Sequence, residues 1–146
     1  MPGIIVGIDG SARSRQALEW AVNEAAVRQA PLTVLTVSEV LAGARWGGPA
    51  YPGDMDRTKQ AQEVAQVETE KVLKKAGGAS KPASVTVRAV TGVAAEQLLN
   101  AAKDADMLVI GSRGAGGFKH LLLGSVSTHI THHAHCPVIV IPTDNA

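Results

Sequence analysis

Short apolar runs alternate with longer stretches of helical periodicity along this chain. Runs rich in Val, Ile and Leu are typical of buried strands, and they cover residues 3–8, 32–37, 85–90, 107–110 and 138–141. Between these runs, apolar residues recur every three or four positions, as on one face of an amphipathic helix. The first predicted helix starts at a cap of Ser11 or Ser14 and ends at Pro31, the second covers 56–76, the third follows Gly92, and the fourth covers about ten residues from Ser125.

The regular alternation of strand and helix predicts the fold. Because each strand is followed by a helix, the strands are expected to be parallel and joined by crossover connections. The first and fourth strands end in glycine-bearing turns, at Ile8-Asp9-Gly10 and Ile110-Gly111. In an open parallel sheet, the ligand crevice lies where the strand order reverses. The sequence therefore predicts one Rossmann-like α/β domain over residues 1–146, with an open, doubly wound five-stranded parallel sheet of order 3-2-1-4-5 and helices on both faces.

Three segments depart from simple periodicity. Residues 41–55 are rich in glycine and proline and show no period, which predicts a mobile surface insert. The apolar stripe of the predicted helix 56–76 is interrupted by Glu68 and Thr69. In the run 85–90, polar and apolar residues alternate, which predicts a strand at a sheet edge with one partly wetted face.

The segment after the fourth strand carries the glycines that bear on function. The strand ends at Gly111, and the spacing is then two residues to Gly114 and nine residues to the pair Gly124-Ser125. Glycines after a strand allow a positive φ and let a phosphate group approach the backbone N–H groups. Gly124-Ser125 would open a helix whose first amides and positive dipole end bind anions. With the hydroxyls of Ser125 and Ser127 as further donors, this segment predicts a phosphate site.

The glycine spacing differs from two other phosphate-binding motifs. No Gly-Lys-Ser/Thr follows the glycines where a Walker A loop requires it. The dinucleotide-binding pattern Gly-x-Gly-x-x-Gly fails because Lys119 stands in the position of its third glycine. For the glycines alone, a simple glycine-rich connection is the alternative interpretation.

Composition excludes several classes of partner. The formal net charge of +1 and the 3% of aromatic residues give no electrostatic or stacking basis for binding nucleic acid. No apolar run reaches the roughly 18 residues of a membrane span, and Asp9 comes too early for a signal peptide. The single cysteine, Cys136, excludes an internal disulfide and suits a reducing compartment. We therefore expect a cytoplasmic protein that binds neither nucleic acid nor membranes.

Histidines near the end of the chain offer a competing site. His129 lies three and four residues before His132 and His133, so these imidazoles share a helix face from which they could bind a metal ion. No Asp or Glu lies among them, and imidazolium also suits the C-terminal end of a helix, which favours a solvated helix end. Cys136 precedes a proline and an apolar strand and is interpreted as a small packed hydrophobe. Asp9 either caps the first helix or serves the crevice.

The spacing Gly-x2-Gly-x9-Gly-Ser resembles the signature of the universal stress protein family, in the subclass that binds ATP. The likeness continues in IIVGIDGS at the first strand, DADMLVIGSRG at the fourth strand and GSVSTHITHHAHCPVIVI at the closing helix and strand. The resemblance implies binding of ATP together with Mg²⁺ or Mn²⁺. The residues implied in binding are Ile8, Asp9, Gly10, Ser11, Val37, Gly111, Ser112, Arg113, Gly114, Gly124, Ser125, Val126 and Ser127.

The resemblance also implies a role for each part of this set. Asp9 and Gly10 would lie near the ribose and the metal ion, with Asp9 acting on the metal directly or through the nucleotide. Val37, at the end of the second strand, would offer its backbone groups to the adenine edge. The glycines, with Ser125 and Ser127, would hold the triphosphate.

A regulatory protein is the predicted functional class. ATP hydrolysis needs a positioned base or water-orienting residue, and a cation at the γ-phosphate. Arg113 and Lys119 would supply charge, but no dedicated base is visible. We expect nucleotide occupancy to alter the surface seen by a protein partner that the sequence does not identify. The alternative is an enzyme of the same architecture that uses ATP as a substrate, through slow hydrolysis or nucleotidyl transfer.

The last strand, Val138–Ile141, is predicted at one edge of the sheet. It carries no charge and no interior proline to deter pairing with another strand. Such an edge can pair with its copy about a two-fold axis. The resemblance implies the same assembly, so we expect a homodimer through this strand.

Overall fold

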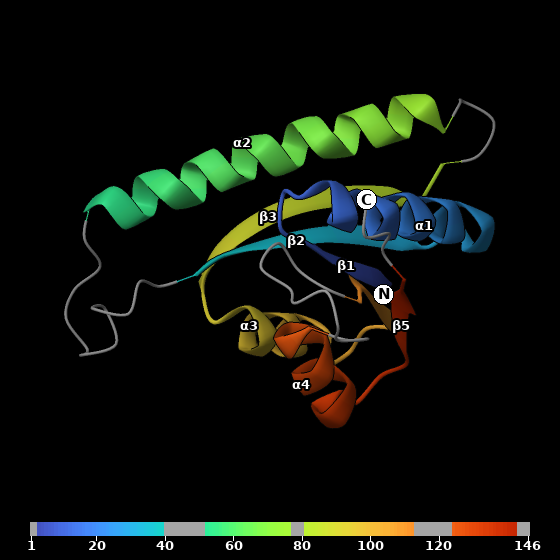
Figure 1. Ribbon diagram of the computed structural model, residues 1–146. Coiled ribbons are helices and arrows are strands. Elements are labelled where there is room, and N and C mark those ends of the chain that lie inside the picture. The colour runs from blue at the N-terminus through green and yellow to red at the C-terminus, as the bar shows by residue number, and fades with distance from the viewer. Residues whose placement is uncertain (1–2, 40–51, 77–80, 113–123, 143–146) are drawn as a thin grey trace.

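The computed structural model describes residues 3–39, 52–76, 81–112 and 124–142 of the 146-residue chain. Strands and helices alternate along the described ranges (Figure 1), as the hydrophobic pattern predicts. Their order is β1 (Ile4–Ile8), α1 (Ala12–Arg28), β2 (Pro31–Glu39), α2 (Pro52–Lys75), β3 (Ser84–Gly92), α3 (Ala94–Ala101), β4 (Met107–Gly111), α4 (Ser125–His133) and β5 (Val138–Ile141).

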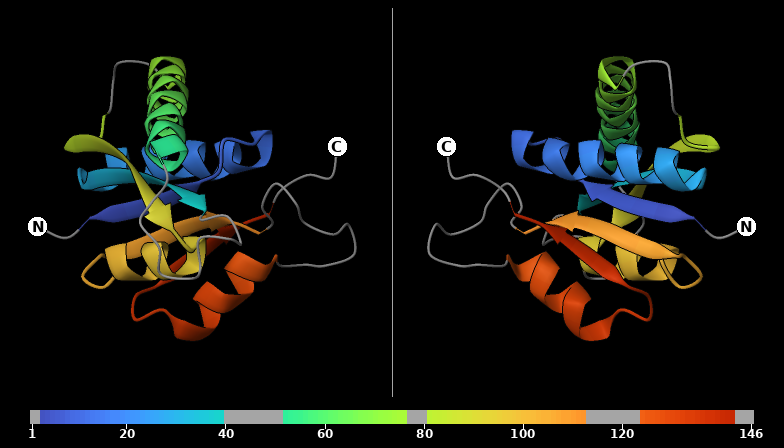
Figure 2. Two further views of the ribbon diagram at one scale, coloured as in Figure 1. Left: turned by 90° about the vertical axis from the view of Figure 1, so that its left-hand side faces the viewer. Right: turned by 90° about the vertical axis from the view of Figure 1, so that its right-hand side faces the viewer.

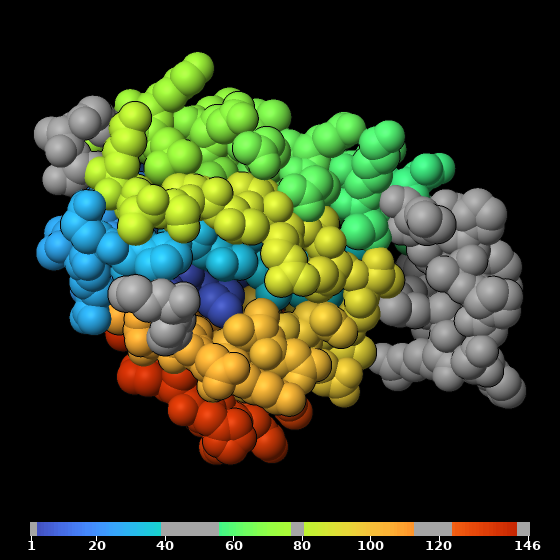
Figure 3. Space-filling view, turned by 180° about the vertical axis from the view of Figure 1, so that it is seen from behind, coloured from blue at the N-terminus to red at the C-terminus, as the bar shows by residue number. Residues whose placement is uncertain are grey.

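These strands form one parallel five-stranded sheet with the order β3-β2-β1-β4-β5, so the predicted fold class and strand order are confirmed. Helices α1 and α2 lie on one face of the sheet, and α3 and α4 lie on the other (Figures 1 and 2). β3 is an edge strand whose residues alternate between exposed and half-buried over most of its length, as the alternating pattern predicted. Seen from behind, α2 runs along β3 (Figure 3).

Each face of the sheet has its own apolar core. Successive residues of β1 supply them in turn, because strand side chains point to alternate faces: Ile4 and Val6 join the core under α1 and α2, and Ile5 joins the core under α3 and α4. The first core also contains Leu18, Val22, Leu32, Val34, Ala65, Val72 and Val109. The second also contains Leu35, Leu98, Leu108, Ile110 and Ile130.

Helix α1 ends earlier than its sequence predicted. Its last residue is Arg28, because Gln29 takes a left-handed backbone with a φ of 51°. The Gln29 side chain donates a hydrogen bond to the carbonyl of Ala26 at 2.8 Å, which satisfies one of the last helical acceptors. Pro31 does not end the helix but begins β2.

Helix α2 differs from the prediction in its start and in its buried face. It begins at Pro52, so the end of the predicted insert 41–55 is helical, and the rest of the insert lies outside the described residues. Thr69 does not interrupt the apolar stripe. Its side chain is 1% exposed and donates to the carbonyl of Ala65 at 2.7 Å. Glu68 forms an ion pair with Arg15 of α1, with Nε and Oε2 3.0 Å apart.

Candidate functional site

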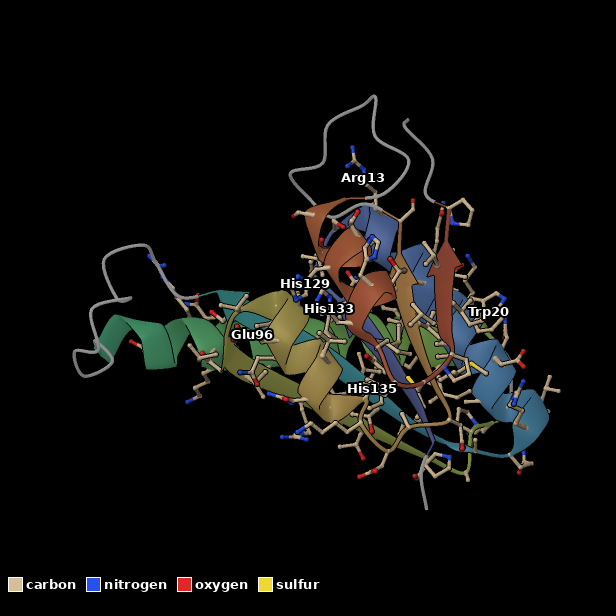
Figure 4. The ribbon with its side chains drawn as sticks, turned by 90° about the horizontal axis from the view of Figure 1, so that it is seen from below. Arg13, Trp20, Glu96, His129, His133 and His135 are labelled. Atoms are coloured by element: carbon tan, nitrogen blue, oxygen red, sulfur yellow. The ribbon has the colours of Figure 1, made fainter. Side chains whose placement is uncertain are left out.

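The carboxyl ends of β1 and β4 lie at the middle of the sheet, and α1 and α4 begin near them on opposite faces. A helix N-terminus carries a positive partial charge. The first turns of both helices contain no acidic residue. Arg13, in the first turn of α1, lies at the same edge of the sheet (Figure 4) and adds a cation. The edge between the two helices therefore favours an anion.

Asp9 and two serines hold the turn between β1 and α1. The Asp9 Oδ1 accepts hydrogen bonds from the Ser11 N–H at 2.9 Å and from the Ser11 hydroxyl. The Ser11 Oγ in turn accepts from the Ser14 N–H at 3.2 Å, so Ser11 is the cap of α1. Asp9 thus supports the cap from outside the helix, and its exposed side chain stands at the carboxyl edge.

Gly10 shows why this turn carries a glycine. Its φ of +82° lies in the region that side chains rarely adopt, and an added Cβ would meet nothing within 4 Å. The backbone therefore turns sharply beside open space at the carboxyl edge, so that a ligand can approach its peptide groups.

The start of α4 presents backbone donors. The cap residue Gly124 has no side chain to bond the first amides, and the first intrahelical bond recorded there is from Thr128 N–H to the Gly124 carbonyl, at 2.9 Å. The N–H groups of Ser125, Val126 and Ser127 precede that bond. Such amides are the donors that hold phosphate at helix N-termini.

Ser127 has a different role for its hydroxyl than the one predicted. It is 3% exposed, and its Oγ donates to the carbonyls of Gly111 at 2.8 Å and Ser112 at 3.0 Å. The Ser112 carbonyl also accepts from the Gly124 N–H at 2.6 Å. The hydroxyl therefore holds the start of α4 to the end of β4, and its hydrogen is used within the protein.

A hollow of about 210 Å³ opens at the carboxyl ends of β1 and β2, beneath α2. Most of its lining is apolar, and Asp9 is the one ionisable residue among the described residues that line it. The lining residues are Ile8, Asp9, Gly10, Thr36, Ala61, Val64 and Ala65. Apolar pockets with a few polar groups are typical of small-molecule sites.

Val37 lies close to this hollow along β2. The last residues paired between β1 and β2 are Ile8 and Thr36, whereas β2 continues beside β3 as far as Glu39. Val37 is therefore the first residue of β2 beyond the end of β1. The predicted strand end at Val37 is two residues too early, because β2 continues to Glu39.

A model of the universal stress protein family matches residues 2–142. The chain belongs to this family. A curated universal stress protein of Mycobacterium tuberculosis is 37% identical over 147 residues, which cover 99% of this chain and 49% of that protein. The chain thus spans about half the length of the curated relatives it matches.

Solved universal stress proteins share the fold. UspA from Lactobacillus plantarum superposes with a TM-score of 0.77 at 22% identity, covering 96% of this chain and 97% of that one. A universal stress protein in complex with cAMP superposes with a TM-score of 0.70 at 25% identity, covering 98% of both chains. Some structural neighbours of this universal stress protein therefore bind nucleotides.

His129, His132 and His133 lie in the C-terminal half of α4 in this universal stress protein. His129 and His133 stack with ring centroids 4.4 Å apart (Figure 4), and the His133 Nδ1 lies 2.9 Å from the His129 carbonyl. Among the described residues, no three His, Cys, Asp or Glu side chains group to hold a metal ion. Cys136 packs against the second core, and this burial raises the pKa of its thiol.

The structure brings together only part of the predicted set. Ile8, Asp9 and Gly10 line the hollow, and the described residues Ser11, Val37, Gly111, Ser112, Gly124, Ser125, Val126 and Ser127 lie at the ends of β1, β2 and β4 or the starts of α1 and α4. Arg113 and Gly114 lie outside the described residues. Within the described ranges, none of the helices has the length and apolar character needed to span a bilayer.

Sequence reasoning missed the α2 wall of the hollow and Arg13. Helical periodicity identified Ala61, Val64 and Ala65 as part of a stripe, but not the strand ends that they face. Val64 belongs to the apolar stripe, and only the structure shows that it is 50% exposed. Arg13 is also unusual for its place, since a cation in the first turn opposes the helix dipole.

Proposed function

We propose that this universal stress protein domain binds ATP at the carboxyl edge of its sheet and acts as a nucleotide-dependent regulatory protein. The proposal rests on one observation: an apolar hollow lies next to two helix N-termini whose first turns contain no acidic residue. One part suits a base and the other suits a polyphosphate. The nucleotide complex of a structural neighbour supports the same class of ligand.

The hollow under α2 is the proposed base site. Its walls are small and apolar where Ala61 and Ala65 line it, which leaves room for a flat ring against the ends of β1 and β2. Val37 would read the adenine edge through its backbone N–H and C=O. Guanine reverses that donor and acceptor pattern, so ATP would be preferred to GTP.

The phosphates would lie against the start of α4. The amides of Ser125 and Val126 supply donors, and the exposed Ser125 hydroxyl adds another. Ser127 would contribute through its backbone N–H, because its hydroxyl is bonded to Gly111 and Ser112.

Asp9 is the residue proposed to serve a divalent cation. Its carboxylate is exposed at the hollow, and Ser11 orients its Oδ1 through two hydrogen bonds. Carboxylate oxygens are preferred ligands of Mg²⁺, which usually also takes substrate phosphate oxygens. Mg²⁺ or Mn²⁺ would neutralise phosphate charge there, and Asp9 would hold it directly or through a bound water.

We also propose a homodimer through β5. Within the described ranges, this strand pairs with β4 and with no other strand. The carbonyl of Pro137 accepts from the Leu108 N–H of β4, and that of Ile141 accepts from the N–H of Ser112, directly after β4. Because backbone groups alternate along a strand, the carbonyls of Val138 and Val140 point to the opposite edge. All four residues of β5 are half-buried in a single chain, so a second copy would bury them further.

Calorimetric titration with ATP and Mg²⁺ tests the base site. Ala61→Leu places a larger side chain in the hollow and should weaken ATP binding by about tenfold or more. Val67→Leu is the matched control, because Val67 is 48% exposed on the same helix and does not line the hollow. Unchanged affinity in folded Ala61→Leu, or no binding by wild type, would refute the proposal. Accumulation of ADP, AMP or pyrophosphate at catalytic rates would instead favour the enzyme alternative.

A further inference from the structure

Gln62 of α2 makes two short hydrogen bonds to the backbone of the edge strand β3. Its Nε2 donates to the Val87 carbonyl at 2.7 Å, and its Oε1 accepts from the Ala89 N–H at 2.7 Å. β3 pairs with β2 along its other edge. Gln62 therefore satisfies backbone groups on the side of β3 that faces away from β2.

The two bonds reproduce the pairing of a parallel strand. In a parallel ladder, a residue donates its N–H to one strand position and accepts from the position two residues further on. The Gln62 amide does this to Val87 and Ala89, on either side of Arg88. The Gln62 side chain thus takes the place of one residue of a neighbouring parallel strand, and it links α2 to β3.

Gln62 sits at the part of α2 that forms the hollow. Its sequence neighbour Ala61 lines the hollow, and Val64 and Ala65 follow within one turn. Ala65 is buried, and the buried residues Thr69 and Val72 of α2 lie C-terminal to this segment.

Among the hydrogen bonds of the described residues, a further one from α2 to β3 lies on the N-terminal side of Gln62. It joins the hydroxyls of Thr58 and Thr91, 2.6 Å apart and exposed to solvent. The two hydrogen bonds of Gln62 are therefore the stronger polar restraint on the wall of the hollow from the β3 side.

We infer that Gln62 is a positioning residue that sets the width of the base site by fixing α2 against β3. This inference rests on the proposed function of the hollow as the base site. Gln62 itself does not line the hollow. It acts through Ala61 and Ala65. Their distance from the ends of β1 and β2 decides whether a flat ring contacts α2 on one side and the strand ends on the other. The phosphate end of the site, at α4, lies on the opposite face of the sheet and is not controlled by this contact.

The test compares Gln62→Leu with Gln66→Leu. The first variant removes both bonds to β3. The second is the matched control, because Gln66 lies one turn further along α2, is exposed and donates to Glu70 at 3.2 Å. Each is titrated with ATP and with inorganic tripolyphosphate, which has no base. Gln62→Leu should lose about tenfold in ATP affinity and keep its tripolyphosphate affinity, and Gln66→Leu should keep both.

A readout without nucleotide checks the contact itself. Amide hydrogen exchange at Ala89 should be faster in Gln62→Leu than in wild type and unchanged in Gln66→Leu. Gln62→Glu retains the acceptor for Ala89 but sets a carboxylate against the Val87 carbonyl, so its ATP affinity should lie between those of wild type and Gln62→Leu.

The outcomes separate the two proposals. Equal ATP affinity in wild type and Gln62→Leu would overturn the inference and leave the base site standing. Equal losses for ATP and tripolyphosphate would also overturn it, because a general loosening of the fold weakens both. Failure of the wild-type protein to bind ATP would overturn the proposed function and, with it, the role of Gln62.

Discussion

Ser125 and Ser127, two residues apart in the first turn of α4, should respond differently to the loss of their hydroxyls. The Ser127 Oγ is buried and bonded to the carbonyls of Gly111 and Ser112, at 2.8 and 3.0 Å. Ser125 is exposed. Ser127→Ala should therefore destabilise the protein in the absence of any ligand, whereas Ser125→Ala should leave its stability nearly unchanged.

The magnitude follows from the partners that remain. A typical hydrogen bond contributes a net 0.5–1.5 kcal/mol, roughly, and a buried acceptor left unpaired costs more. In Ser127→Ala, the Ser112 carbonyl keeps its bond from the Gly124 N–H at 2.6 Å, so the larger loss falls on Gly111. We expect a decrease in the free energy of unfolding of about 1–2 kcal/mol. For a chain of 146 residues this lowers the Tm by about 3–6 °C.

Urea and thermal unfolding of both variants, followed by circular dichroism, measure this difference. Ser125→Ala should stay within about 0.5 kcal/mol of wild type, yet lose ATP affinity by a few-fold because it removes a proposed phosphate donor. A Ser127→Ala protein as stable as wild type would refute the role of this hydroxyl as a clamp between β4 and α4. A loss of stability in Ser125→Ala would show that an exposed hydroxyl at the start of α4 also stabilises the fold, and would refute the distinction between the two serines.

Four further results are expected. Gly124→Val should abolish ATP binding in calorimetry without unfolding the domain, because its side chain would occupy the phosphate approach to α4; retained binding contradicts this. ATP should outcompete GTP by about 100-fold or more in a displacement assay if the backbone of β2 reads the base, and equal competition rules that out. Val140→Pro removes an N–H from the open edge of β5, so sedimentation should shift from dimer toward monomer; a monomeric wild type at micromolar concentration refutes the edge pairing. Gly7→Ala should cost about 1–3 kcal/mol in urea unfolding, because its Cβ would lie 2.8 Å from the Leu98 Cδ2, and Leu98→Val should relieve part of that cost.

The sequence was sufficient for the fold because the relevant signals are local. Strand and helix differ in hydrophobic period, and parallel strands follow once helices separate them. The order of the sheet followed from the glycine turns after Ile8 and Ile110, since ligand crevices form where the order reverses. The glycine spacing, and the lack of charge and of an interior proline in β5, are likewise properties of short segments.

Boundaries were less predictable because they depend on particular contacts. α1 stops at a left-handed Gln29, whose side chain caps the helix, so the later Pro31 has no helix to end. Thr69 looked like an interruption of the α2 stripe, yet its hydroxyl is satisfied by the Ala65 carbonyl of the same helix. Polarity in a sequence does not reveal whether a hydrogen bond within the helix permits burial.

Local pattern thus determined the elements of this protein, their order in the sheet and the edge at which a ligand would lie. Tertiary structure alone decided which side chains meet there. It brought Ala61 and Ala65 of α2 over the ends of β1 and β2, and it turned the Ser127 hydroxyl toward backbone carbonyls. It also joined Gln62 to β3. Such contacts depend on how a helix crosses a sheet, and that crossing is set by the packing of both elements together rather than by either sequence segment.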